Sequence, residues 1–246
     1  MDAAQALVAQ AERITVLTGA GISTDSGIPD FRGPQGVWTK DPAAQRSSNI
    51  ADYVADPDVR RRVWQMRLAS PAWTAEPNPG HVALVDLERQ GRLHTLVTQN
   101  IDGLHQRAGN DPARVVELHG TMREVACLAC GDRGPMEPVL DRLRAGEDDP
   151  GCLRCGGLLK SATISFGQSL VPADLRRAER AALEGDLLLA VGSSLTVSPA
   201  CNLVDVAVAC GAPVVVVNAQ PTPYDRVAAA VVREPISDVL PGLVAP

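Results

Sequence analysis

The residues best suited to acid–base chemistry lie close together between positions 98 and 120. A short apolar run that predicts a buried strand ends there, and the polar side chains of Gln99, Asn100 and Asp102 follow at once. A second apolar run ends on His119, beside a glycine that leaves room for a substrate. Because a neutral imidazole can accept a proton near pH 7, we interpret His119 as a candidate general base. The alternative is a hydrogen-bonded histidine that ends a strand.

A glycine turn near the start of the chain is the second candidate site. Gly19, Ala20 and Gly21 follow a predicted strand and should open a helix. Free backbone amides and the positive end of a helix would attract an anion such as a phosphate. The pattern is incomplete, because Thr24 replaces the third glycine of a dinucleotide-binding fingerprint and no acidic residue ends a second strand about 20 residues later. The turn by itself is compatible with a cofactor site or with an ordinary connection.

The segment after this turn, residues 26–34, is rich in glycine and proline. That composition argues against a helix or a central strand and predicts an ordered or closing loop. Long loops beside a glycine turn often carry binding residues. The segment is equally compatible with a surface connection that buries Phe31 in the core.

Two C-x-x-C pairs predict a metal site. They join Cys127 with Cys130 and Cys152 with Cys155. Each pair offers two thiolates on one tight turn, and two such turns complete a tetrahedron around zinc. A zinc ion with four sulfur ligands has no open position for catalysis, so we expect a structural role. The remaining thiols, Cys201 and Cys210, are expected to be buried as small apolar side chains.

The elements that must position these residues alternate between strands and helices. Strands are predicted at 14–17, 93–97, 114–118, 161–167, 186–191 and 214–217, and helices at 3–12, 50–67, 80–90, 137–145, 172–183 and 200–210. Within 50–67, Asp56 and Pro57 form an internal helix start signal. Such alternation is typical of a doubly wound α/β fold with a parallel sheet. In open sheets of this kind, ligands bind outside the carboxyl ends of the strands. We therefore expect the polar residues that follow the strands to meet at one edge.

Composition narrows the possible function classes. The 246 residues are 45% hydrophobic and 21% charged, which is ordinary for a globular protein. The net charge of -6 argues against a nucleic-acid surface, so no direct nucleic-acid partner is expected. The first residues lack a basic signal sequence and no apolar run reaches membrane-spanning length, so we expect a cytoplasmic protein without membrane contact.

The motifs occur in an order that resembles the sirtuin family over nearly the whole chain. They are GAGIS at 19–23, SGIPDFR at 26–32, TQNIDGLH at 98–105, HG at 119–120, the paired cysteines, FG at 166–167, GSS at 192–194 and Asn218. The resemblance implies an α/β protein, a Rossmann-like doubly wound parallel sheet with an inserted zinc-binding and helical module. It implies an NAD-binding domain made of residues 1–40, 76–120 and 161–246, and a small module made of residues 41–75 and 121–160.

The same resemblance implies an activity and assigns residues to it. Acyl groups would be removed from lysine side chains of proteins, consuming NAD and releasing nicotinamide and O-acyl-ADP-ribose. His119 and Asn100 would be catalytic, with His119 as the base that activates a ribose hydroxyl. The implied NAD contacts are Gly19, Ala20, Gly21, Asp30, Phe31, Arg32, Gln99, Asn100, Ile101, Asp102, Gly192, Ser193, Ser194, Asn218, Ala219, Gln220 and Ile236. The acylated protein would bind along Ile164, Ser165, Phe166 and Gly167, and one structural zinc ion would bind the four paired cysteines.

Three positions depart from the family pattern. Ser161 stands where proline is usual and Gln168 stands where glutamate is usual, which affects the expected peptide preference. Relatives that remove succinyl groups carry a Tyr-x-x-Arg pair, whereas this chain has Trp64 followed by Arg67. Because a buried unpaired carboxylate is strongly unfavourable, we expect acetyl to be preferred over succinyl. Arg67 is then expected to face solvent or to pair with an acid.

Mono-ADP-ribosyl transfer to protein at the same site is the main alternative function. A hydride-transferring dehydrogenase is disfavoured by the incomplete glycine fingerprint. A zinc-ribbon binding module is disfavoured by the acidic net charge and by a glycine turn that lies far from the cysteines in sequence.

Overall fold

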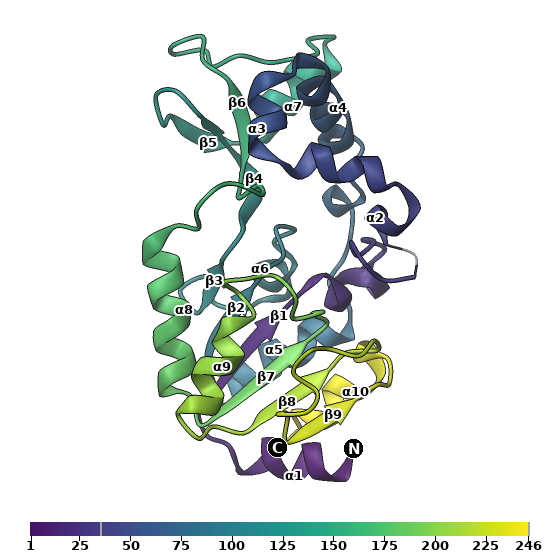
Figure 1. Cartoon of the computed structure of the whole chain (residues 1–246), viewed down its shortest axis with the longest axis vertical. Coiled ribbons are helices and arrows are strands. Elements are labelled where there is room, and N and C mark those ends of the chain that lie inside the picture. Colours follow the sequence, from purple (N-terminus) through teal and green to yellow (C-terminus); the bar gives the residue numbers. More distant parts are fainter. Residues whose placement is uncertain (35, 246) are drawn as a thin grey trace.

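A computed structural model describes residues 1–34 and 36–245 of the chain. Figure 1 shows a lower part built on a parallel sheet and an upper part built on a second sheet and helices. The six strands of the parallel sheet lie in the order β3-β2-β1-β7-β8-β9. They span Ile14–Thr18 (β1), Leu93–Thr98 (β2), Val115–Glu117 (β3), Leu187–Val191 (β7), Val214–Val217 (β8) and Ala230–Val232 (β9). The predicted doubly wound parallel sheet is confirmed. The strand predicted at 161–167 is not part of it, because Leu159–Thr163 pairs antiparallel with residues 120–127 in a second sheet.

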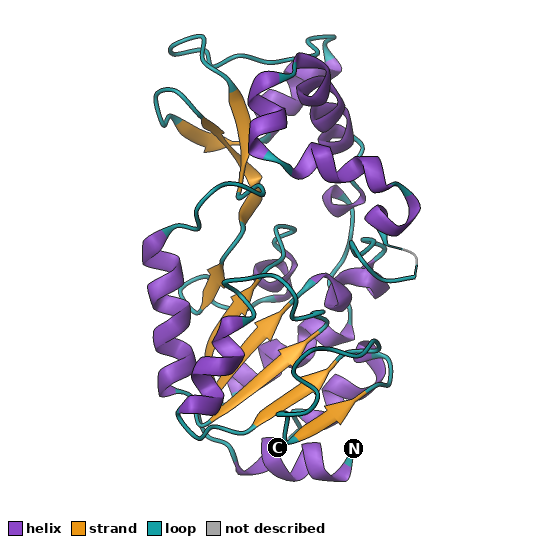
Figure 2. Ribbon diagram, viewed as in Figure 1, coloured by secondary structure: helices purple, strands orange, loops and turns teal. Residues whose placement is uncertain are grey.

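Helices cover both faces of this sheet (Figure 2). One face packs against α1 (Asp2–Gln10), α5 (Pro79–Arg89) and α10 (Ile236–Leu243), and the other against α8 (Pro172–Glu184) and α9 (Asn202–Ala209). Alternate residues of β1 supply the two cores, Ile14 and Val16 on one side and Leu17 on the other. Full burial of such a side chain stabilises a fold by about 1.5–3 kcal/mol. Because both faces are covered, the central strands are continuous apolar runs, and this is why the sequence predicts them.

The upper part contains a second sheet and three helices, which together we call the small module. Its antiparallel strands lie in the order β5-β4-β6 and span Gly120–Cys127 (β4), Arg133–Pro135 (β5) and Leu159–Thr163 (β6). The helices are α3 (Ile50–Ala55), α4 (Pro57–Leu68) and α7 (Glu137–Arg144). Trp64 of α4 is fully buried against Val125, Leu140 and the paired cysteines Cys127 and Cys152.

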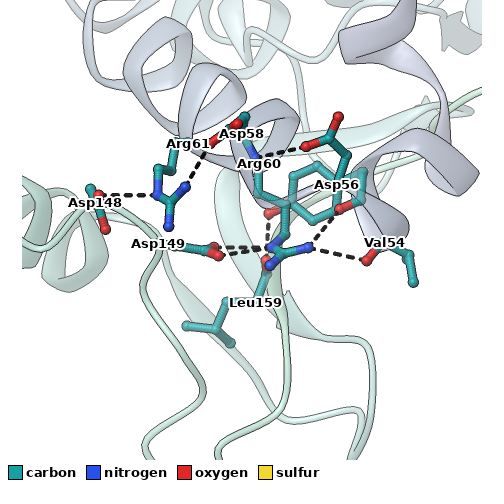
Figure 3. Close-up of polar contacts among 9 residues, drawn as sticks. Val54, Asp56, Asp58, Arg60, Arg61, Asp148, Asp149 and Leu159 are labelled. Atoms are coloured by element: carbon teal, nitrogen blue, oxygen red, sulfur yellow. Dashed lines mark hydrogen bonds and ion pairs between the residues drawn. The ribbon is translucent and has the colours of Figure 1, made fainter.

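A buried ion pair joins the helices of the small module to the loop before the second cysteine pair (Figure 3). Arg60 Nε lies 2.9 Å from Asp149 Oδ2, and the two side chains are only 10% and 20% exposed. Arg60 Nη1 also donates to the carbonyl oxygens of Tyr53 at 3.2 Å and Val54 at 3.1 Å. The Tyr53 hydroxyl donates to the carbonyl of Leu159 at 2.6 Å. Buried polar contacts therefore help to hold the small module together, whereas the parallel sheet is held mainly by apolar packing.

The predicted helix over residues 50–67 is two helices that meet at Asp56. The Asp56 side chain accepts a hydrogen bond from the amide of Asp58 at 2.9 Å, which caps the start of α4. Pro57 then occupies the first helical position, where its missing N–H is not needed. The Asp-Pro pair therefore ends one helix and begins the next.

The remaining elements are short, and most are absent from the sequence predictions. They are α2 (Val37–Lys40), α6 (Leu104–Ala108) and the 3-10 segments Ala20–Ser26, Pro42–Ser48 and Pro71–Trp73. The expectation for the two lone thiols is half wrong, because Cys201 is buried whereas Cys210 is exposed just after the last turn of α9. Within residues 1–34 and 36–245, no helix is long and apolar enough to cross a membrane.

Candidate active site at the carboxyl edge of the sheet

The strand register brings the polar strand ends to one edge. Thr18 pairs with Thr98 on one side and with Val191 on the other, and these in turn pair with Glu117 and Val217. The residues that follow the strands are therefore neighbours: Gly19, Gln99, Leu118, Gly192 and Asn218. The strand order reverses between β1 and β7, which is where open α/β sheets bind their ligands.

Three glycines allow two turns to approach closely at this reversal. The Gly21 amide donates to the carbonyl of Gly192 at 2.8 Å, and the Gly19 amide donates to the carbonyl of Val191 at 3.0 Å. A Cβ atom on Gly192 would lie 2.3 Å from the amide nitrogen of Ile22, so no side chain fits there. The expectation of free amides is therefore wrong for Gly19 and Gly21, and the turn opens a 3-10 segment instead of an α-helix. What the glycines provide is the close packing of the two turns, because a side chain on any of them would strike the facing backbone.

A buried hydrogen-bond network connects this turn to the residues after β2. The Asn100 side-chain amide donates to the carbonyl of Gly19 and to Ser23 Oγ, each at 3.1 Å. Ser23 Oγ donates to Asp102 Oδ2 at 2.8 Å, and Asp102 Oδ1 accepts from the amide of Leu104 at 2.9 Å. The structure thus brings Asn100 and Asp102 together, as predicted. It adds Ser23, which is 1% exposed and has no assigned role in the sequence analysis.

Two buried histidines lie behind this network, and the sequence analysis gives neither a role in the site. His81 Nδ1 accepts from the backbone amide of Asn78 at 3.3 Å, so the ring proton sits on Nε2, 3.4 Å from Ser23 Oγ. Burial lowers the pKa of His81 to about 4, which keeps the ring neutral. The His105 ring packs beside it, and its Nε2 lies 2.9 Å from Thr18 Oγ1. The only local signal for His81 is its spacing from Asn78, which produces a capping box.

His119 is held in the orientation that a general base needs. Its Nδ1 lies 3.0 Å from the backbone carbonyl oxygen of Gln99. Because a carbonyl can only accept, Nδ1 carries the proton and Nε2 keeps its lone pair. Burial lowers the pKa of His119 below its ordinary value of 6.5, so the ring is neutral at pH 7. The side chain of Gln99 reaches across the sheet edge and donates to Ser193 Oγ at 2.9 Å.

The segment after the glycine turn is an ordered loop at the same edge. Asp30 Oδ1 accepts from the amide of Gly33 at 2.9 Å, and the Asp30 carbonyl accepts from the amide of Val37 at 2.8 Å. The Phe31 side chain is 42% exposed, so the alternative in which it fills the core is wrong. The guanidinium of Arg32 lies over the ring of Trp38, 4.6 Å from its centroid.

The other predicted cofactor residues follow β7 and β8. Ser194 Oγ lies 2.8 Å from Thr196 Oγ1, and the Asn218 side chain donates to the carbonyl of Gln220 at 2.8 Å. Ala20, Ile101, Ala219 and Ile236 belong to the same edge, where Ile236 begins α10. Gln99 connects these residues to His119, because its side chain donates to Ser193 and its backbone carbonyl accepts from the His119 ring.

The predicted substrate segment lies directly beside the histidine. The amide of Ile164 donates to the backbone carbonyl of His119 at 2.8 Å. Further along, the amide of Phe166 donates to the carbonyl of Ser48 at 2.8 Å, and the Phe166 carbonyl accepts from the amide of Ile50 at 3.0 Å. The segment therefore joins the sheet edge to the small module.

The four paired cysteines form a cluster that fits zinc. Their sulfur atoms all lie within 4.8 Å of one another, with Cys127 to Cys155 at 3.5 Å and Cys130 to Cys152 at 3.8 Å. A tetrahedral zinc ion with bonds of about 2.3 Å requires sulfurs roughly 3.8 Å apart. Each pair is followed by a glycine in the left-handed region, which a tight turn of this kind favours. With sulfur in all four positions, the metal would have a structural role.

Arg67 lies in an environment that differs from the expected one. Its Nη2 donates to Ser161 Oγ at 3.1 Å and the residue is partly buried, so the contact that the structure shows is to a hydroxyl and not to an acid. Burial lowers the pKa of Arg67 to about 10. Trp64 Nε1 and Arg67 Nε are both buried without a hydrogen-bond partner in the described part of the chain. The expectation for Arg67 is wrong, because Ser161 provides a polar partner that the usual proline would not.

Comparison with known proteins gives one consistent result. A sequence profile of the Sir2 family matches residues 19–199. The chain is 54% identical over 230 residues to NAD-dependent protein deacetylase 2 of Streptomyces coelicolor, covering 94% of this chain and 95% of the relative. It is 40% identical to the NAD-dependent protein deacetylase of Rhodopseudomonas palustris, covering 95% and 92%.

Solved structures agree with the sequence relatives. A Sir2 structure with a deacetylated p53 peptide and 3'-O-acetyl ADP ribose superposes with a TM-score of 0.88 at 35% identity, covering 96% of this chain and 94% of that one. A Sir2 structure with a p53 peptide and NAD+ gives a TM-score of 0.84 at 35% identity, covering 96% and 93%. These matches cover both the parallel sheet and the small module.

Proposed function

The chain belongs to the Sir2 family and is an NAD-dependent protein deacetylase, and we propose that its reaction takes place at the carboxyl edge of the parallel sheet. The observation that carries this proposal is the setting of His119. Its proton is held on Nδ1 by the Gln99 carbonyl, and its own carbonyl bonds the substrate segment at Ile164. A base with a free Nε2 thus lies at the same sheet edge as the two glycine turns, at residues 19–21 and 192, and beside the segment expected to bind the acylated protein.

We propose that NAD lies along the two glycine turns. Its nicotinamide half would contact residues that follow β2, and its adenosine half would contact residues that follow β7 and β8. Cβ atoms on Gly19, Gly21 or Gly192 would strike the backbone of the facing turn, so glycine lets the two turns pack together and sets the shape of the edge along which the pyrophosphate would lie. Asn100 and Asp102, fixed through Ser23, are suited to the carboxamide and ribose end. Ser193, Ser194, Asn218, Ala219, Gln220 and Ile236 would hold the adenosine half. When bound, NAD supplies a ribose carbon that accepts the acyl oxygen as nicotinamide leaves.

The side chains of this chain then have separate tasks. His119 accepts a proton from a ribose hydroxyl at Nε2, while Nδ1 stays bonded to the Gln99 carbonyl. Asn100 donates its side-chain N–H groups to Gly19 and Ser23, which leaves the side-chain oxygen Oδ1 as the acceptor for the ligand. The half-exposed ring of Phe31 covers the edge and excludes water, which would otherwise compete for the electron-poor ribose. The acyl group comes from a lysine side chain of a protein bound along residues 164–167.

One product analysis tests this function. Wild-type protein is incubated with NAD and an acetyl-lysine peptide, and the products are identified by mass. We expect nicotinamide, free lysine peptide and O-acetyl-ADP-ribose in equal amounts. Protein or peptide that has gained the mass of ADP-ribose, without release of free lysine, would indicate mono-ADP-ribosyl transfer. Formation of NADH would indicate a dehydrogenase. Either result would refute the proposal.

We further propose the domain division and the location that the resemblance implies. Residues 1–40, 76–120 and 161–246 would form the NAD-binding domain, and residues 41–75 and 121–160 the inserted module; of these, residues 35 and 246 lie outside the described part. A cytoplasmic location is supported by the six free cysteines, four of them grouped for a metal, because thiols persist in reducing compartments.

A further inference from the structure

Arg233 follows the edge strand β9 and has no role in the proposed chemistry. The last residue of β9, Val232, pairs with Val217 of β8. Asn218, the residue after β8, donates its backbone amide to the carbonyl of Val232 at 3.0 Å. The residues that follow β8 and β9 are therefore neighbours at the carboxyl edge of the sheet.

The side chain of Arg233 reaches back to the loop that follows β8. Its Nη1 donates to the backbone carbonyls of Asn218 at 2.7 Å and Gln220 at 2.8 Å. Its Nη2 forms an ion pair with Asp225, which lies at the other end of the same loop. Asp225 is itself fixed, because its Oδ1 accepts from Thr222 Oγ1 at 2.7 Å. One guanidinium thus joins the two ends of this loop.

Packing does little to fix the first part of this loop. Ala219, Gln220 and Pro221 are exposed, so hydrogen bonds have to hold their main chain in place. The side chain of Asn218 depends on the same main chain, because its Nδ2 donates to the carbonyl of Gln220 at 2.8 Å. This bond uses an N–H of the Asn218 side-chain amide and leaves Oδ1 as the acceptor for a ligand.

We infer that Arg233 is a positioning residue for the adenosine half of NAD, and that it acts by holding Asn218 in its binding conformation. Without the guanidinium, the carbonyls of Asn218 and Gln220 would turn to water and the exposed loop would adopt other arrangements. A site that is competent for only about a tenth of the time binds its ligand about tenfold more weakly. The inference rests on the proposed function, because that proposal assigns the adenosine half to Asn218.

Binding of ADP-ribose, which contains the adenosine half of NAD but no nicotinamide, tests this role. Its dissociation constant is measured by calorimetry for wild type, Arg233→Met and Arg226→Met. We expect Arg233→Met to weaken ADP-ribose binding by about tenfold. Arg226 is the matched control, because it is exposed directly after Asp225 and its replacement removes the same charge. Arg226→Met should bind ADP-ribose as wild type does.

Two further measurements on Arg233→Met separate positioning from general damage to the fold. Because Arg233 acts on cofactor binding and does not touch the reacting atoms, the KM for NAD should rise while kcat at saturating NAD stays within about twofold of wild type. The dissociation constant of an acetyl-lysine peptide should be unchanged, since the peptide is proposed to bind along residues 164–167.

A double variant tests whether Arg233 acts through Asn218. Asn218→Ala alone should weaken ADP-ribose binding, and the added Arg233→Met should weaken it by less than about twofold more. Unchanged ADP-ribose binding in Arg233→Met, an equal loss of peptide binding, or additive losses in the double variant would overturn the inference. Each of these outcomes leaves O-acetyl-ADP-ribose formation by wild type intact, so it is distinguishable from failure of the proposed function.

Discussion

The parallel sheet and the small module hold their residues in different ways. Every residue of β1, β7 and β8 is buried, and the cores on both faces of the sheet are built from aliphatic side chains. The small module has a smaller core in which two metal-binding cysteines take part, and it adds the buried Arg60–Asp149 pair. The two parts of the molecule are therefore stabilised by different interactions. The edge proposed for the chemistry is fixed by apolar packing on both faces of the sheet, whereas we expect the small module to depend on a bound metal and a buried ion pair for its shape.

Loss of the metal should produce the largest effect, and it should be confined to the small module. Structural zinc stabilises domains of this kind by on the order of 10 kcal/mol. Cys127→Ser or chelation should release zinc and unfold residues near β4–β6, with activity lost indirectly. Hydrogen exchange should rise there and stay low in β1 and β7. Cys210→Ser is the matched control, because its exposed thiol lies outside the cluster. Full activity without bound metal would contradict the structural role.

Replacing His119 should show the opposite pattern, a loss of chemistry without loss of fold. Removal of a general base slows a reaction by about 10²–10⁴. His119→Ala should therefore lose that much in kcat, with a melting temperature close to wild type. His94→Ala is the control, since His94 pairs with Glu184 away from the proposed site. Near-normal turnover of an acetyl peptide by His119→Ala would remove the assignment.

The buried ion pair of Arg60 with Asp149 should contribute more to the stability of the small module than the exposed ion pair of Arg61 nearby. Removing one partner of a buried pair leaves an uncompensated charge, which costs about 3–5 kcal/mol when burial is complete. Arg60 and Asp149 are slightly exposed, so we expect Arg60→Met to lower module stability by about 1–3 kcal/mol. Arg61→Met removes the solvent-exposed pairs of Arg61 with Asp148 and Asp58, and should change stability much less than Arg60→Met. Denaturant unfolding of the two variants measures the loss in the free energy of unfolding. Equal losses would argue against a special role of Arg60.

The acyl preference should be the smallest effect. Arg67 Nη2 already donates to Ser161, whereas Trp64 Nε1 and Arg67 Nε are buried donors without a partner in the described part of the chain. A succinyl carboxylate that reached these donors would lose its hydration, so we expect only a modest preference for the uncharged acetyl group. We expect kcat/KM for an acetyl peptide to exceed that for its succinyl version by about tenfold, which corresponds to about 1.4 kcal/mol. Trp64→Tyr should narrow the difference. A wild-type preference for succinyl that Arg67→Met removes would show this reasoning to be wrong.

The sequence predicts best those features that one segment encodes by itself. The apolar runs of β1, β7 and β8 are buried on both faces, so their composition alone identifies them. The polar residue that follows each run then marks the sheet edge. The cysteine spacing similarly contains the geometry of a zinc site within two short turns.

Features that depend on distant partners could not be predicted. Neither face of β4 is buried along the whole strand. Its residues therefore show no regular apolar pattern that would identify a strand. The hydrogen bond from Ser23 to Asp102 joins residues 79 positions apart, and that from Arg60 to Asp149 joins residues 89 apart. The environment of Arg67 depends on Ser161, which the chain brings close only after folding. Tertiary packing decides these contacts, and no local pattern reports them.

The pH dependence of kcat/KM tests most directly whether the sheet edge carries the chemistry. Burial lowers the pKa of His119 below 6.5, and only the neutral ring can act as base. The rate should therefore be constant around pH 7 and fall as the pH drops through the lowered pKa. The midpoint should lie below 6.5, and the residual activity of His119→Ala should lack this acidic limb. A rate that rises only above pH 7, or an acidic limb that persists in His119→Ala, would contradict the account.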